Sequence, residues 1–172
     1  MVAGLVLASL IGMAGQPVSN RHVRTTEARI LAIVEEGVAE SATFRRLVET
    51  LDASDVIVYL EPKLNERGLG GYLSHRMVVA GPMRYLKIAV DLRGGRDRLV
   101  ALVAHELQHA VEVAEATEVR DSQSMVRLFE RRTIAHSCGG GCFETAAALD
   151  VQEAVLAELR LQRAVAVTAG LP

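Results

Sequence analysis

Residues 99–119 read LVALVAHELQHAVEVAEATEV, and this segment determines how the rest of the chain is interpreted. No Gly or Pro interrupts residues 97–119, and the aliphatic side chains would cover nearly the whole circumference of a helix. An apolar surface on all sides is typical of a helix buried inside a protein. The sequence therefore predicts one buried helix over residues 97–119.

The predicted helix carries His105, Glu106 and His109 in the pattern H-E-x-x-H. Residues four apart on a helix lie on the same face, so both imidazole rings can reach one metal ion with Glu106 beside it. The alternative is an exposed helix with two hydrogen-bonded histidines. We favour metal binding, because an unpaired imidazole in an apolar helix would cost free energy.

The composition indicates one domain without a nucleic-acid partner. The chain has 172 residues, of which 50% are hydrophobic, enough for a sizeable core. The net charge is −2, and the aromatic residues are three Tyr and three Phe with no Trp. No basic block or platform for stacking bases is therefore expected.

The first fifteen residues, MVAGLVLASLIGMAG, contain no charged side chain. This stretch is too short to span a membrane but fits the apolar region of a secretory signal, with Gly12 and Ala14 before a cleavage site. We predict an apolar leader over 1–15, a linker over 16–25 and one domain over 26–168. The protein is then exported to the periplasm or the outside of a bacterial cell. If the leader is instead a buried helix, the protein is cytoplasmic.

Two cysteines, Cys138 and Cys142, flank three glycines. In an oxidising compartment they can close a disulfide across a very tight loop. A metal site that uses His136 with both thiolates is an alternative, although C-x3-C is not the usual zinc spacing. Two free thiols in a cytosolic protein are the third possibility.

The remaining elements follow from periodicity and turn residues. We expect helices that begin after Thr26 and Ser41, strands over 56–60, 72–80 and 84–92, and helices over 97–119, 122–132 and 143–165. The last two strands form an antiparallel hairpin around Gly81-Pro82. Helices, then strands, then helices argue for an α+β fold.

A catalytic zinc ion usually has three protein ligands, and the motif supplies two. Glu112 is about 10 Å along the helix from His105, too far for both to bind one ion. Glu115 would need a glycine at position 112 to turn the chain back. We therefore predict a solvated helix face for Glu112, Glu115 and Glu118.

Glu144 is the best candidate for the third ligand. It follows a glycine-rich turn at the start of the last predicted helix, at the head of an apolar stripe formed by Ala147, Ala148, Val151, Val155 and Leu159. A carboxylate on the buried side of a helix needs a partner or a metal ion. Alternatives are Glu130, Asp150 and Glu153, or a purely helix-stabilising role for Glu144.

The AHELQHA core, preceded by a strand hairpin and followed by FETAAA, resembles the gluzincins and small bacterial proteins with a minimal metallopeptidase domain. The resemblance covers residues 55–161 and implies a zincin-like α+β fold. In that fold a small antiparallel or mixed sheet packs on the HExxH helix and a C-terminal helix. It further implies that His105, His109 and Glu144 bind one Zn²⁺ ion and that Glu106 is the general base.

The chain departs from the gluzincin pattern at Ala148, where many members carry an aspartate that orients a zinc-bound histidine. The residue that stabilises the oxyanion is also unassigned, with four candidates: Tyr72, His75, Tyr85 and His136.

Our leading hypothesis is a zinc metallopeptidase that hydrolyses peptides or proteins by a zinc-bound water activated by Glu106, with the strand over 72–80 pairing with the substrate. The alternatives are a non-catalytic exported scaffold domain of zincin fold and a plain α+β domain with an accidental motif.

Overall fold

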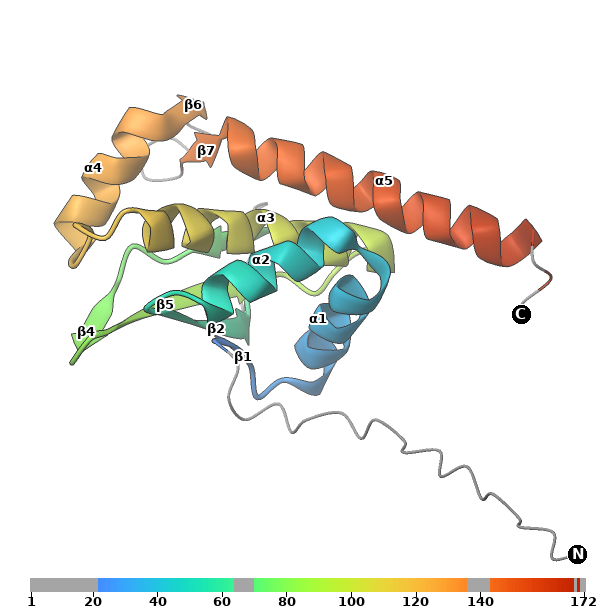
Figure 1. Cartoon of the computed structure of the whole chain (residues 1–172), viewed down its shortest axis with the longest axis horizontal. Coiled ribbons are helices and arrows are strands. Elements are labelled where there is room, and N and C mark those ends of the chain that lie inside the picture. The colour runs from blue at the N-terminus through green and yellow to red at the C-terminus, as the bar shows by residue number, and fades with distance from the viewer. Residues whose placement is uncertain (1–21, 64–69, 136–142, 169, 171–172) are drawn as a thin grey trace, which may run out of the picture.

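The computed structural model describes residues 22–63, 70–135, 143–168 and 170. The helices are α1 (Ala28–Glu40), α2 (Ala42–Asp52), α3 (Arg96–Glu115), α4 (Ser122–Arg132) and α5 (Ala146–Thr168). The described chain is α+β, as predicted, with a mixed sheet, α3 and α5 above it and α1 beside it (Figure 1). The predicted leader over 1–15, Cys138 and Cys142 lie outside the described residues. None of the described helices is long and apolar enough to cross a membrane.

The main sheet contains β1 (Val23–Arg24), β2 (Val56–Pro62), β3 (Gly71–Leu73), β4 (Val78–Ala80) and β5 (Met83–Val90). Strands β1, β2 and β5 run parallel in that order, while β3 and β4 both pair antiparallel with β5. A second, two-stranded ribbon joins β6 (Thr133–Ala135) to β7 (Glu144–Thr145).

Helix α3 is the centre of the fold, as its apolar sequence predicts. It packs against α1, α2 and the sheet on one side and against α5 on the other. Figure 1 shows α3 between the sheet and the long α5. Fourteen of its residues are buried, His105, Glu106 and His109 among them. The motif is therefore held inside one hydrophobic core.

Hydrogen bonds and ion pairs hold helix α5 against α1, α2 and α3. Near its middle, Glu158 accepts hydrogen bonds from Ser41 Oγ at 2.6 Å and from Thr43 N at 3.1 Å, at the N-terminus of α2. Near its end, Arg163 forms ion pairs with Glu36 on α1 and Asp97 on α3. These contacts make α5 antiparallel to α3 and bring its first turn towards the motif.

Arg84 at the start of β5 joins the sheet to the C-terminal end of α3. Its side chain is fully buried, with 0% exposure, and Nε donates to Asp55 Oδ2 at 2.9 Å. Its other nitrogens donate to four backbone oxygens at and after the end of the helix, those of Val113, Ala114, Ala116 and Val119. The guanidinium group thus supplies a donor to the carbonyls of Ala114 and Val119, and a second donor to those of Val113 and Ala116, which also accept from Ala116 N and Val119 N.

The structure corrects four sequence-based boundaries. The predicted strand over 72–80 is two strands, because Ser74 Oγ accepts a hydrogen bond from Arg76 N and turns the chain between them. The predicted linker over 16–25 includes β1, which pairs with β2. Helix α3 ends at Glu115, where Arg84 binds its carbonyls. Helix α5 begins at Ala146, after β7.

Two expectations about the first helices have different outcomes. Ser41 is the N-cap of α2, as predicted, and accepts from Phe44 N at 3.0 Å. Glu27, and not Thr26, is the N-cap of α1. Gly37 on α1 lets the two helices pack closely, because a Cβ atom at this position would lie only 2.6 Å from the ring of Phe44 on α2.

Candidate metal centre

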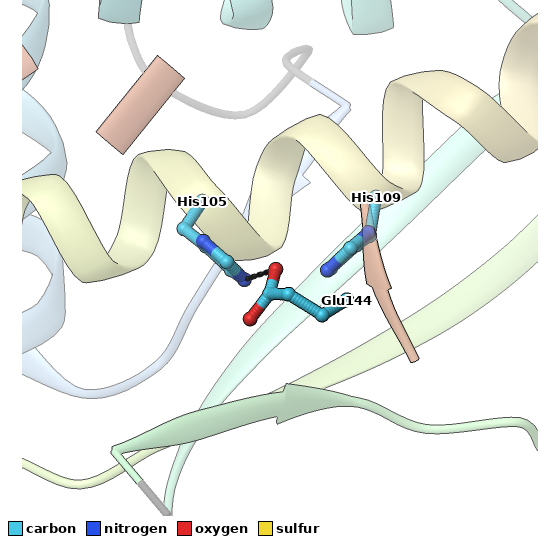
Figure 2. Close-up of side chains that lie close together, drawn as sticks. All are labelled: His105, His109 and Glu144. Carbon is cyan, nitrogen blue, oxygen red and sulfur yellow. Dashed lines mark ion pairs between the residues drawn. The ribbon is translucent and has the colours of Figure 1, made fainter. Parts of the chain in front are cut away.

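The structure brings His105, His109 and Glu144 together, the three residues that the sequence analysis selected as ligands. One nitrogen or oxygen atom from each lies within 4.8 Å of the others. Figure 2 shows the two rings projecting from successive turns of α3 towards the Glu144 carboxylate. His105 Nε2 lies 3.3 Å from Glu144 Oε1. Both histidines are buried and Glu144 is partly buried.

Glu144 reaches the site from β7, and not from the head of a helix as we predicted. Thr133 on β6 fixes its backbone, since the hydroxyl donates to Glu144 O at 3.1 Å and accepts from Glu144 N at 3.2 Å. Thr145 Oγ1 then accepts from Ala148 N and begins α5. The predicted stripe on α5 holds at Ala148, Val155 and Leu159 but not at Ala147, which is exposed.

Two buried polar atoms in the described structure have no hydrogen-bond partner, and both belong to this group. They are Glu144 Oε1 and His105 Nδ1. Buried polar atoms are nearly always paired, so an unpaired carboxylate oxygen that faces an imidazole nitrogen fits a bound cation. Two imidazoles and a carboxylate are also a donor set that proteins use for divalent metals. The group could therefore hold a metal ion.

The buried position and the neighbouring charges shift the pKa values of His105 and His109. Burial, followed by the charge of His109, lowers the pKa of His105 to about 4. Burial also lowers the pKa of His109, but hydrogen bonding to Glu112 and the charges of nearby carboxylates outweigh it, so its net shift is upward. The neutral form of His105 that results is the form that binds metals.

Glu106 is 4% exposed and lies beside the edge of the sheet. A Cβ atom placed on Gly71 of β3 would be only 3.1 Å from Glu106 Oε1, so the carboxylate lies directly against that strand. Burial raises the pKa of Glu106 to about 7, although the charge of His109 acts in the opposite direction. A carboxyl group with a pKa near neutrality can both take up and release a proton.

Glu112 corrects one of our predictions. We expected a solvated face for Glu112, Glu115 and Glu118, but Glu112 is 3% exposed and Glu115 and Glu118 are exposed. Glu112 Oε2 lies 3.0 Å from His109 Nδ1, the ring nitrogen that faces away from Glu144. The three-residue spacing from His109 puts both side chains on one helix face, which is the sequence signal that we missed.

The other predicted candidates stand apart from the cluster. Glu130, Asp150 and Glu153 are exposed, and none belongs to the group that could hold a metal. Among the candidates for oxyanion stabilisation, Tyr72 is exposed on β3 and Tyr85 lies at the far end of β5, opposite Val78. His136 lies outside the described residues.

A row of aromatic rings connects the site to His75, which follows β3. The ring of His109 meets Phe129 edge-on at 5.4 Å, and Phe129 stacks on Phe143 at 5.9 Å. His75 lies 5.4 Å from Phe143, the residue next to Glu144. Of the oxyanion candidates within the described chain, His75 is thus linked to the site through its neighbours.

Comparison of the chain with protein-family models, curated proteins and solved structures gives no match. The fold and the site define the chain as an α+β protein with a buried His-His-Glu group that could hold a metal ion.

Proposed function

We propose that this chain is a zinc-dependent metallopeptidase, with His105, His109 and Glu144 as ligands and Glu106 as general base. The observation that carries the proposal is the position of Glu106. Its buried carboxylate lies against Gly71 at the sheet edge, and Glu106 is next in the chain to His105 of the three-residue group, so a substrate carbonyl and a water molecule would meet near it.

The donor set supports zinc, which takes nitrogen and oxygen ligands and in catalytic sites has three protein ligands. Zinc in such a site supplies Lewis acidity, which lowers the pKa of water and polarises a carbonyl group. Glu106 would accept the proton from the water and later deliver it to the departing amine. Its raised pKa suits both transfers.

The sheet edge supports a peptide as the substrate. β3 is the last strand in the described sheet order, and its first residue is the one that contacts Glu106. An extended peptide can add to such an edge through main-chain hydrogen bonds. The predicted substrate strand over 72–80 is thereby narrowed to Gly71–Leu73, because β4 lies at the opposite end of β5.

The test compares zinc content and cleavage of a fluorogenic peptide library for the wild type, Glu106→Gln and the control Glu115→Gln. Glu115 is exposed on the same helix and pairs with Arg132. We expect one zinc per chain in all three proteins, with cleavage by the wild type and the control only. Absence of zinc from the wild type, or equal cleavage by Glu106→Gln, would refute the proposal.

The alternative is a non-catalytic exported binding or scaffold domain of zincin fold, with or without a metal ion. Two observations favour it: Ala148 stands where many gluzincins have an orienting aspartate, and His105 Nδ1 has no hydrogen-bond partner in the described structure. A protein that holds one zinc per chain but cleaves nothing in the library would support this alternative. Export remains a proposal from the apolar leader, and N-terminal sequencing of the protein secreted from its host tests it.

A further inference from the structure

We propose that Glu112 is a positioning residue for the metal centre, because it holds His109 in the tautomer whose Nε2 is available to the metal. The inference rests on the proposed metal binding and assigns a role to a residue outside the ligand set. The two histidines then differ, because only the Nδ1 atom of His109 has a carboxylate partner.

The contact between Glu112 and His109 is short and shielded from water. Glu112 Oε2 and His109 Nδ1 are 3.0 Å apart, and both residues are at least 95% buried. No other hydrogen bond of the Glu112 side chain is found within the described residues. A buried charge without a hydrogen-bond partner is costly, so the Glu112 carboxylate is expected to keep its hydrogen bond to His109.

The chemistry of the pair fixes the tautomer. An ionised carboxylate only accepts hydrogen bonds, so Nδ1 of His109 must carry the hydrogen. The lone pair of the neutral ring then resides on Nε2, on the side of Glu144 and His105. Metal-binding histidines in proteins commonly have such a partner, which also sets the orientation of the ring.

Neighbouring rings restrain His109 further. The ring of Phe129 meets it at 90° and 5.4 Å, and the ring of His105 meets it at 85° and 4.9 Å. His105 is the internal contrast, because its Nδ1 is buried without a partner among the described residues.

The substitution Glu112→Gln tests the role with little change in shape. A glutamine amide can turn its NH2 group towards Nδ1 and thereby favour the wrong tautomer. We expect the zinc dissociation constant to rise by about 10–100-fold, the usual effect of losing such a partner. Glu112→Asp keeps the charge one methylene further away and should give an intermediate loss, while Glu115→Gln is the matched control.

Two readouts are needed: zinc affinity from competition with a chromophoric chelator, and the tautomers of His105 and His109 from nitrogen NMR of the metal-free protein. We expect His109 to be protonated on Nδ1 in the metal-free wild type and to become mixed in Glu112→Gln. Loss of affinity with the tautomer unchanged, or a wild-type His109 protonated on Nε2, would overturn the inference. If the wild type takes up no zinc, the proposed function fails, whereas the NMR result still decides the role of Glu112.

Discussion

Arg84 offers the strongest test of how the fold holds the C-terminal end of α3, the helix that carries His105 and His109. The substitution Arg84→Met keeps most of the buried volume but removes every donor. Asp55 then loses its bidentate partner, and the carbonyls of Ala114 and Val119 lose their donor, while those of Val113 and Ala116 keep backbone N–H partners. An unsatisfied buried acceptor costs about 1–3 kcal/mol, but the helix end can relax and admit water, so these costs do not add.

We therefore expect a loss of about 3–5 kcal/mol in the free energy of unfolding, which comes mainly from the two carbonyls left without a donor, because Asp55 is 32% exposed and water can replace part of its lost pairing. Total stability is typically about 5–15 kcal/mol, so the loss is a large fraction of it. With a urea m-value of about 2 kcal/mol/M, the unfolding midpoint falls by about 2 M. Arg84→Lys restores a charge with three donors and should lie between the two proteins.

The assay is urea unfolding followed by far-UV circular dichroism, since the chain has no Trp to report by fluorescence. The control is Arg160→Met at an exposed position on α5, which should change stability by less than about 0.5 kcal/mol. If Arg84→Met unfolds at the same urea concentration as this control, the idea that Arg84 fastens the sheet to α3 is wrong.

Three further predictions concern pH, the sheet edge and the metal. The hydrogen bond and charge of Arg84 hold the pKa of Asp55 below its ordinary 3.8, so below about pH 4 the unfolded chain binds a proton that the folded chain lacks, and the free energy of unfolding falls. An Asp55→Asn variant lacks this proton and should lose stability less steeply with acid; an equally steep loss would contradict the account. Gly71→Ala places a Cβ atom 3.1 Å from Glu106 Oε1 and 3.2 Å from Ala89 O, so we expect kcat for peptide cleavage to fall while the zinc content stays the same. An unchanged kcat would show that Glu106 has room to move. Zinc at about 1,000 times its dissociation constant should raise the free energy of unfolding by about 4 kcal/mol, and EDTA should reverse the gain; equal stability with and without zinc would mean that the folded chain has no such site.

The motif and its helix could be predicted because they are local. The uninterrupted apolar run fixes α3, and the four-residue spacing fixes the shared face of His105 and His109. Glu144 could be selected by elimination, since distance along the helix excludes Glu112 from the ligand set. Its place on β7 could not be predicted, because it depends on pairing with β6.

Glu112, beside the candidate ligands, and Arg84, at the end of α3, show why some buried polar residues were not predicted. A charged residue in a helix usually points to water, so Glu112 was grouped with Glu115 and Glu118, although the apolar run predicted a buried helix and the three-residue spacing placed Glu112 beside His109. Arg84 looks like an ordinary polar position at the start of a strand. Its buried role needs the end of α3 above β5, a long-range contact that periodicity does not encode.

The central claim is that His105, His109 and Glu144 form one zinc site. X-ray absorption at the zinc edge of the stoichiometrically loaded protein tests it most directly. We predict only nitrogen and oxygen ligands, at about 2.0–2.2 Å, and loss of stoichiometric zinc in Glu144→Ala. A shell of sulfur at about 2.3 Å, or a Glu144→Ala variant that binds zinc as tightly as the wild type, would contradict the account.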